Sequence, residues 1–222
     1  DSLRQKVLRE PGVTGAAPFV LSKTVIAHQK NQDGIMVYGI DPALSRGVIG
    51  IPETVKRGVY RLDSMMDSST GRMYPSILLG YALADRLAVF AGDKVFLADF
   101  SKATLMTGTF APRVQPFVVA GIFESGMYQY DESLAYISLA AAQKLFDIPN
   151  QATGIQVRIQ DPYQSPRVAD VLEERLGFPY RAVDWQAKNY TLIKWMNYEK
   201  VLVSLLQRFR LIAGFGLPQL PA

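Results

Sequence analysis

Apolar residues recur with two different spacings along the chain, and these spacings predict a mixture of strands and helices. Helical spacing predicts helices at residues 2–10, 76–90, 138–146 and 165–176, the second with Leu79, Leu83 and Leu87 on one stripe. The polar cluster at residues 31–34 predicts a turn, because Asn, Asp and Gly favour tight turns. Alternating or continuous apolar runs predict strands at residues 13–26, 35–40, 94–100, 104–110, 116–123, 134–137, 153–159 and 180–183.

Particular residues mark the ends of these predicted helices. Pro11 and Gly12 should end the first helix, because proline cannot continue the helical hydrogen-bond ladder. Ser138 should be an N-cap, since its hydroxyl can accept a hydrogen bond from an orphaned backbone N–H. The helix at 165–176 should have Ser165 as its N-cap and end at Gly177.

The order of these elements predicts an α+β protein with two lobes. A β-turn-β unit at the front and a β-α-β unit at the back flank a strand-rich middle. We therefore expect a discontinuous α/β lobe made of residues 1–46 and 150–200. Residues 47–149 should form an inserted β-rich lobe, and residues 201–222 a membrane-proximal or non-native tail.

Composition excludes several classes of protein. The 222 residues are 49% hydrophobic, a share typical of a globular chain. The net charge of +4 comes from scattered Lys and Arg, which does not favour nucleic-acid binding. The chain starts without Met or a signal peptide, so it resembles an excised segment. Aromatic and Lys residues before the apolar run 201–206 indicate either a membrane–water interface or an ordinary packing helix.

The residues needed for common catalytic chemistry are missing from the sequence. There is one histidine, His28, and no cysteine, so zinc sites and Ser-His or Cys-His relays lack their parts. His28 is expected at the surface or in a turn. We expect no catalytic residue, no metal site and no cofactor, and therefore a protein that binds other molecules without transforming them.

The first candidate binding segment is a proline-bracketed stretch that we expect to join two strands. Prolines restrict the backbone and reduce the entropy that a loop loses on binding. Arg113, at the expected tip, offers a rigid donor fork for a carboxylate or for carbonyls. A plain hairpin whose prolines only protect the sheet edge is the other interpretation. The candidate partner-binding residues are Thr109, Phe110, Ala111, Pro112, Arg113, Val114, Gln115, Pro116 and Phe117.

The second candidate segment is an aromatic loop after the strand at 116–123. Met127, Tyr128 and Tyr130 follow the flexible Gly126, and together they make an adaptable amphipathic surface suited to lipid or peptide. The alternative is that these side chains pack onto the neighbouring lobe. The sequence leaves both interpretations open.

Two motifs carry a resemblance to a known family. Residues 77–95, with Leu-Leu-Gly, Leu-Ala and a closing Gly-Asp-Lys-Val, resemble a stretch found in MacB-type permeases in general. The run PFVVAGIFESGMYQYDESLAYISLAAAQKLF at residues 116–146 is more specific. It resembles a segment of the bacterial lipoprotein-releasing ABC permeases of the LolC/LolE type, and Gly-Ile-Gln-Val at residues 154–157 also fits.

The resemblance implies a periplasmic domain of a bacterial inner-membrane permease with a MacB-type periplasmic core fold. Implied partners are a lipoprotein substrate, a second permease subunit, a cytoplasmic ATPase subunit and a LolA-type carrier. A hairpin hook in this family grips the carrier, and residues 109–117 match its position. A LolC-like chain, a LolE-like chain and a single permease with both roles all stay open. The alternative is a MacB-like efflux or envelope-signalling permease that binds a periplasmic adaptor.

Overall fold

The computed structural model describes residues 2–100 and 112–188. The expected strand at 104–110 and the aromatic segment at 190–200 lie outside the described residues, as does the tail 201–222. The strands are β1 (Val13–His28), β2 (Asn31–Ile40), β3 (Val55–Gly58), β4 (Ser64–Met66), β5 (Met73–Gly80), β6 (Lys94–Asp99), β7 (Arg113–Phe123), β8 (Leu134–Ser138) and β9 (Gly154–Ile159). Of these nine described strands, six overlap a strand predicted from the sequence, whereas β3, β4 and β5 do not.

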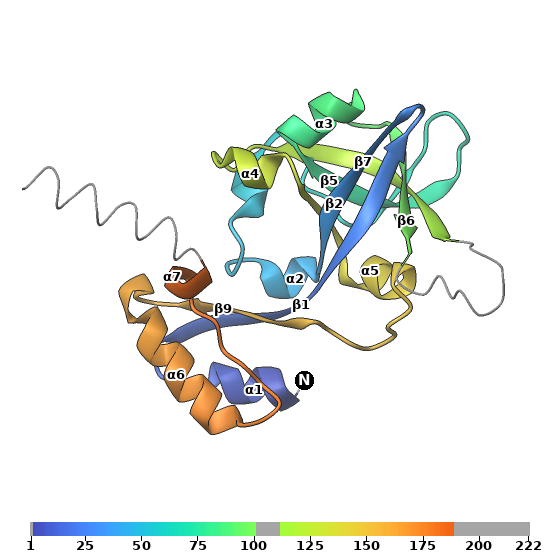
Figure 1. Ribbon diagram of the computed structural model, residues 1–222. Coiled ribbons are helices and arrows are strands. Elements are labelled where there is room, and N and C mark those ends of the chain that lie inside the picture. The colour runs from blue at the N-terminus through green and yellow to red at the C-terminus, as the bar shows by residue number, and fades with distance from the viewer. Residues whose placement is uncertain (1, 101–111, 189–222) are drawn as a thin grey trace, which may run out of the picture. The chain divides into compact units, whose positions relative to one another are not determined.

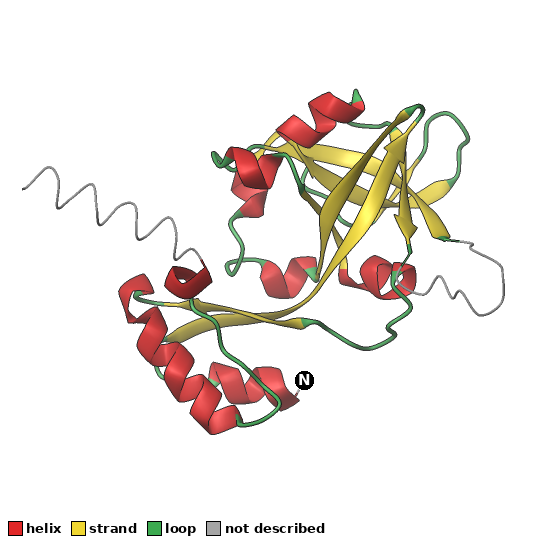
Figure 2. Cartoon of the chain, viewed as in Figure 1, coloured by secondary structure: helices red, strands yellow, loops and turns green. Residues whose placement is uncertain are grey.

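Short helices connect these strands (Figure 2), and two of them end at residues that the sequence marked. Ser138 caps α5 through its hydroxyl, which accepts a hydrogen bond from the Ala141 N–H, so the predicted N-cap is confirmed. Gly177 ends α6 as expected, with a positive φ of 63°. The helices are α1 (Ser2–Leu8), α2 (Pro42–Ser45), α3 (Tyr81–Leu87), α4 (Tyr128–Asp131), α5 (Leu139–Leu145), α6 (Ser165–Leu176) and α7 (Trp185–Lys188), with 3-10 turns η1 (Ile51–Thr54) and η3 (Pro162–Gln164).

Six strands close into a barrel. The pairing runs from β7 through β6, β1, β2, β8 and β5, and β5 pairs with β7 again. Two of these contacts, β2–β8 and β5–β7, are parallel, and the others are antiparallel. β3 pairs with β7 and β4 with β5, so both short strands extend the sheet outside the closed ring.

Side chains of the barrel strands alternate between two apolar clusters, as the two-residue period of a strand requires. On β5, Ile77 and Leu79 belong to the larger cluster and Leu78 to the smaller one. The larger cluster also contains residues of α3 and α5, including Leu83 and Leu145. In Figure 1, these two helices lie at opposite ends of the barrel. They therefore close its interior, which is filled by buried apolar side chains.

β1 is long enough to serve two parts of the sheet. Its second half pairs with β2 and β6, whereas β9 pairs with its first half (Figure 1). Hydrogen bonds join the Thr153 N–H to the Phe19 carbonyl and the Thr14 hydroxyl to the Arg158 carbonyl, so β9 runs antiparallel to β1. Strands from the front and the back of the chain therefore pair with each other.

The barrel also contains β2, which we had assigned to the α/β lobe of residues 1–46 and 150–200. β2 pairs with β8, and therefore lies in one sheet with the strands of the middle segment. The reason is that one continuous strand, β1, carries both sets of partners. Compact units of the chain are residues 1–158 and 159–222, a division that differs from the expected boundaries at 46/47 and 149/150.

Four local predictions were wrong. Ser165 is the first residue of α6, and the N-cap position is taken by Gln164. The first turn is at Gln29 and Lys30, where Gln29 has a φ of 51°, and residues 31–34 are already in β2. The helix expected at 76–90 begins only at Tyr81, because the apolar run before it is β5 and is buried on both faces. The strand expected at residues 180–183 does not form. Among the described residues, no helix is long and apolar enough to cross a membrane.

Candidate functional site

The first candidate segment proves to be a strand for most of its described length. β6 and β7 pair antiparallel from Lys94 opposite Val118 to Asp99 opposite Arg113. Arg113 is therefore the first residue of a paired strand, and its expected place at a loop tip was wrong. The strand predicted at residues 116–123 begins already at Arg113. Although Arg113 and Gln115 are polar, pairing with β6 holds them in the sheet. Thr109, Phe110 and Ala111 lie outside the described residues.

The pair of strands presents an apolar outer face beside this segment. Phe96 lies opposite Pro116 and Ala98 opposite Val114, so these four side chains share one face of the sheet. Val114 is 52% exposed, and Phe96 is also exposed. Phe117 points the other way and is fully buried in the barrel core. Of the candidate residues that are described, Val114 thus offers apolar surface and Phe117 does not.

The Arg113 side chain contacts two other residues of this chain, Lys144 and Asp147. Its guanidinium donates a hydrogen bond of 2.9 Å to the Lys144 carbonyl and lies 3.4 Å from the Asp147 carboxylate. Both partners belong to the end of α5 and the turn after it. About half of the Arg113 side chain is exposed, so it can still reach a partner, but its orientation is set by α5.

The second candidate segment forms the short helix α4 and the turns around it. Met127 is 42% exposed and Tyr128 is 58% exposed, whereas Tyr130 is half-buried. We call residues 125–133 the α4 segment. Of these three candidate residues, Met127 and Tyr128 are therefore exposed to solvent, and Tyr130 is partly covered by the protein.

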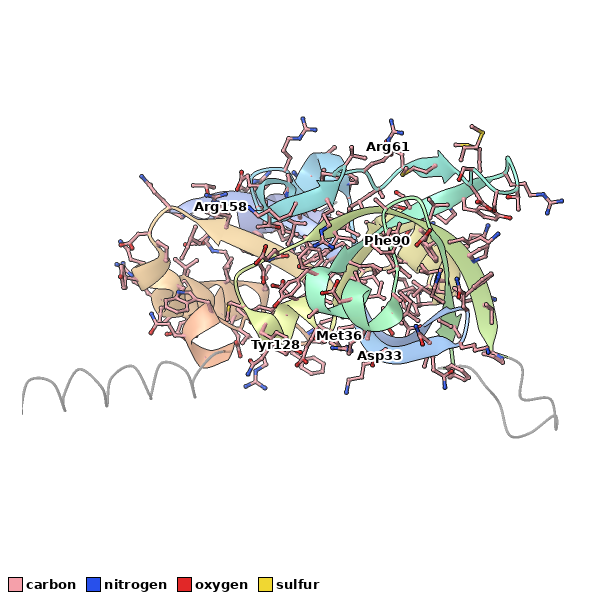
Figure 3. The ribbon with its side chains drawn as sticks, turned by 90° about the horizontal axis from the view of Figure 1, so that it is seen from above. Asp33, Met36, Arg61, Phe90, Tyr128 and Arg158 are labelled. Atoms are coloured by element: carbon pink, nitrogen blue, oxygen red, sulfur yellow. The ribbon has the colours of Figure 1, made fainter. Side chains whose placement is uncertain are left out.

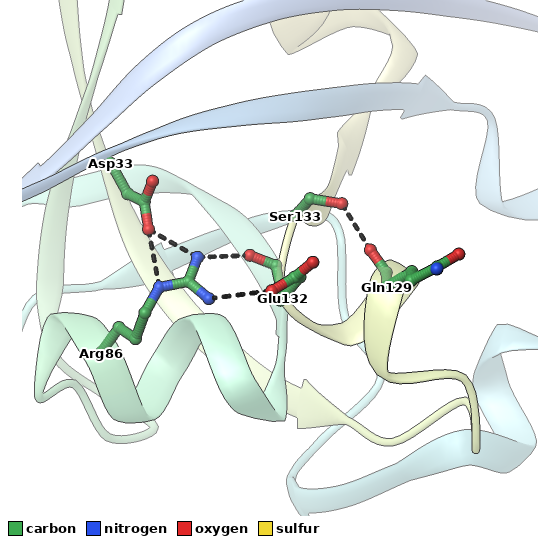
Figure 4. A network of polar contacts seen from close by, with 5 residues as sticks. All are labelled: Asp33, Arg86, Gln129, Glu132 and Ser133. Carbon is green, nitrogen blue, oxygen red and sulfur yellow. Dashed lines mark hydrogen bonds and ion pairs between the residues drawn. The ribbon is translucent and has the colours of Figure 1, made fainter.

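Internal contacts brace the α4 segment. The buried carboxylate of Asp131 accepts two hydrogen bonds from the Ser125 N–H, at 2.9 and 3.2 Å. The Ser133 hydroxyl donates to the Gln129 carbonyl at 2.7 Å (Figure 4). Gly80, just before α3, lies so close that a Cβ there would overlap the Asp131 backbone carbonyl. Glycine is required at position 80 because the two backbones are in contact.

Arg86 of α3 ties the α4 segment to the barrel (Figure 4). Its guanidinium donates to the Asp33 carboxylate on β2, with an Nε–Oδ2 distance of 2.8 Å. It also donates to the Glu132 carbonyl at 2.6 Å and lies 3.7 Å from the Glu132 carboxylate. The hydrogen bond to Asp33 raises the pKa of Arg86 further above its already high usual value. Three segments distant in the sequence are thus joined by one side chain.

Sequence reasoning missed Arg86, because nothing in its local pattern indicates partners at positions 33 and 132. It also missed Asp67, whose buried carboxylate accepts hydrogen bonds from the Thr70 and Ser69 hydroxyls and forms an ion pair with Lys94 at 3.0 Å. These hydrogen bonds, that from Thr70 above all, hold the pKa of Asp67 well below its usual range. Its sequence signal was the run Asp-Ser-Ser-Thr-Gly, which is typical of a side-chain-capped turn.

Two further titratable side chains, Tyr136 and His28, are buried. Tyr136 stacks against Tyr38 in the smaller apolar cluster, and burial raises its pKa well above the usual value. His28 is buried at the end of β1, where Nδ1 lies 3.0 Å from the Lys94 carbonyl, so its expected surface position was wrong. Within residues 2–100 and 112–188, no three His, Cys, Asp or Glu residues gather as metal ligands would.

Comparison with known proteins supports the resemblance seen in the sequence. No family model matches the chain. It is 31% identical over 199 residues to the "Lipoprotein-releasing system transmembrane protein LolC" of Xylella fastidiosa strain 9a5c, a match that covers 90% of this chain and 46% of that protein. The chain is thus similar to LolC over nine tenths of its own length. The LolC of Neisseria meningitidis serogroup B strain MC58 is 26% identical over 208 residues, which cover 93% of this chain and 48% of that protein.

The chain spans about half the length of the curated LolC relatives it matches. Its fold resembles the extracellular domain of the noncanonic ABC-type transporter YknZ from Gram-positive bacteria, with a TM-score of 0.52 and 15% sequence identity over 83% of this chain and 88% of that one. The predicted α+β class and the resemblance to lipoprotein-releasing permeases are confirmed.

Proposed function

We propose that this chain is the periplasmic part of an inner-membrane ABC permease that releases lipoproteins and passes them to a LolA-type carrier. The observation that carries the proposal is the identity of 30–31% to LolC proteins over 90% of the chain. ATP hydrolysis would take place on a separate cytoplasmic subunit, and a second permease subunit would complete the transporter. A binding role agrees with the exposed apolar surfaces beside β6–β7 and on the α4 segment.

Residues 109–117 would contact the carrier. Support comes from the outer face of β6 and β7, where Phe96 and Val114 expose apolar area directly beside this segment. Apolar and arginine side chains commonly act as anchors in small interfaces. Arg113, already oriented by α5, would lose little conformational entropy when it contacts a partner. The second surface, with Met127, Tyr128 and the half-buried Tyr130, would contact the lipoprotein or the second permease subunit.

Carrier binding is tested with two matched valine variants. Val114 and Val59 are 52% and 53% exposed, but only Val114 belongs to the proposed contact segment, residues 109–117. Val114→Asp in the full-length permease should weaken binding of the organism's own carrier at least about tenfold, which is about 1.4 kcal/mol. Val59→Asp should leave the affinity unchanged. Affinity is measured by surface plasmon resonance on permease in lipid nanodiscs.

Two outcomes would contradict the proposal. Equal affinity of the wild type and Val114→Asp would show that this face does not bind the carrier. If no carrier binds the wild type, while an adaptor protein from the same organism does, the chain would function as a MacB-like permease instead.

A further inference from the structure

Two methionines lie side by side on the hairpin formed by β4 and β5. Met66 is directly opposite Met73, and the next pair toward the tip, Asp67 and Arg72, is joined by a backbone hydrogen bond of 2.8 Å. Hydrogen-bonded and non-hydrogen-bonded pairs alternate in an antiparallel ladder, so Met66 and Met73 form a non-hydrogen-bonded pair, in which the Cα atoms lie about 4.5 Å apart. Their side chains therefore share one face of the hairpin and can contact each other.

Both thioethers of this pair are open to solvent. Met66 is 64% exposed and Met73 is 61% exposed, larger fractions than for any other methionine in residues 2–100 and 112–188. Met127 follows with 42%, and Met36 and Met65 are half-buried. Methionine usually fills gaps in an apolar core, as Met65 does against the smaller apolar cluster. The exposed pair does not serve the core in this way.

The hairpin is fixed by groups other than these two sulfur atoms. The buried Asp67 carboxylate accepts a hydrogen bond from the Thr70 hydroxyl at 2.6 Å and forms an ion pair with Lys94 of β6 at 3.0 Å. Neither contact involves Met66 or Met73. A chemical change at the two sulfur atoms should therefore leave the tip of the hairpin attached to the barrel.

We propose that the Met66–Met73 pair is the site at which hydroperoxides oxidise this protein while it is folded, and that the fold tolerates both sulfoxides. In each step, a lone pair of the thioether sulfur attacks one oxygen of the peroxide. The sulfur–oxygen bond forms, the oxygen–oxygen bond breaks, and the departing hydroxide takes the proton of the attacked oxygen to give water. The sulfur loses two electrons and the peroxide gains them, so each methionine consumes one peroxide.

Oxidation at this pair changes the surface of the hairpin more than its packing. The thioether is apolar, whereas the sulfoxide is polar, and reductases can convert it back. Because both sulfur atoms lie on one face, an exposed apolar patch becomes polar. Oxidation of Met65 would instead bring a polar group into the smaller apolar cluster, which costs stability unless the group finds a hydrogen bond. This chemistry does not depend on the proposed function.

The selectivity of oxidation is measured by treating the folded chain with excess hydrogen peroxide and following each methionine by peptide mass spectrometry. Met66 and Met73 should react at least about fivefold faster than Met36 and Met65, because the folded protein shields the latter two sulfur atoms. In Figure 3, Arg61, which precedes β4, lies at the upper edge of the drawing and Met36 at the lower edge, so Met36 is a control away from the hairpin. In urea the four rates should converge. Equal rates in the folded chain would overturn the proposal.

Neighbouring positions on β4 test whether the fold tolerates the change. Glutamine is close to methionine sulfoxide in length and polarity, so the double variant Met66→Gln/Met73→Gln should melt within about 2 °C of the wild type. Met65→Gln, one residue earlier on the same strand, should melt at least about 4 °C lower, because its side chain packs against the smaller apolar cluster. Wild type oxidised at Met66 and Met73 should melt like the double variant. Equal melting temperatures of the double variant and Met65→Gln would refute the proposed tolerance.

Discussion

Asp67 shows how one buried carboxylate organises a turn. It accepts hydrogen bonds from the Ser69 and Thr70 hydroxyls and from the Ser69 N–H, and Lys94 approaches from the start of β6. The turn between β4 and β5 is thereby fixed to a neighbouring strand of the barrel. Such a carboxylate stabilises the fold only while it is ionised, because its partners are all donors.

Asp67→Asn should lower the melting temperature at neutral pH and change how stability depends on pH. The folded-state pKa of Asp67 is depressed, so its contribution is present above the unfolded-state pKa of about 3.9 and is lost as pH falls below that value. Wild type and variant should therefore differ at pH 7 and converge under acid conditions. Urea denaturation at several pH values measures this, and a constant difference across the range would contradict it.

Gly39→Ala should destabilise the protein by about 1–3 kcal/mol, because overpacking a core contact has costs of this size. A Cβ at Gly39 of β2 would overlap the Cβ of Ala142 in α5. The double variant with Ala142→Gly removes that overlap and should recover part of the loss. Gly34→Ala, where a Cβ would meet nothing within 4 Å, is the matched control. Denaturant midpoints are compared, and no recovery in the double variant would argue against this contact.

At the scale of elements, the barrel strands and the helices that close it were predicted to different degrees. β8, α5 and α6 were found almost in full, because short polar or capping residues separate their apolar runs. β5 was taken for helix, since Leu79, Leu83 and Leu87 fit a helical stripe although Leu79 belongs to the strand. A continuous apolar run that is buried on both faces has no period to distinguish the two.

The candidate surfaces show the same limit. The sequence singled out Met127, Tyr128 and Tyr130 but left open whether they are exposed or packed, and it could not indicate Arg86, whose partners are distant in the chain. It also placed Arg113 in a loop, because prolines on both sides suggested a turn. Pairing with β6 decides that position, and tertiary pairing cannot be inferred from local composition.

Ser138→Ala should cost about 1 kcal/mol, because the Ala141 N–H would lose its capping acceptor. Ser138→Asp should retain most of the stability, since a carboxylate caps a helix equally well. The effect should appear as faster amide exchange at the start of α5 as well as a lower denaturant midpoint. A Ser138→Ala protein as stable as the wild type would show that packing alone holds α5.

At the scale of the whole molecule, the closed ring explains why the structure needs few external elements to bury its core. Barrel closure leaves no free edge among the six ring strands, and α3 and α5 cover the two open ends. Side chains from all six strands share the larger cluster. Damage at one position should therefore weaken the barrel as a unit.

Ile137→Ala should destabilise the barrel by about 2–5 kcal/mol, and Ile137→Val by about 0.5–1.5 kcal/mol. Ile137 is fully buried on β8, in register with Gly39 of β2 and Ile77 of β5. Fluorescence and far-ultraviolet circular dichroism should report one common transition for residues of the barrel. Separate transitions, or a loss well below this range for the alanine variant, would show that β8 is not an integral part of the core.

The parallel pairing of β2 with β8 also has a consequence for how the chain acquires its structure over time. Met36 and Leu134 are neighbours in the barrel although they lie about 100 residues apart in the sequence. During synthesis, β1 and β2 emerge long before β8, so the hairpin carries an unsatisfied edge until most of the chain is available. Folding dominated by such distant contacts is slow, in the millisecond to second range. The newly made hairpin is therefore the part of this protein that most needs protection from premature association.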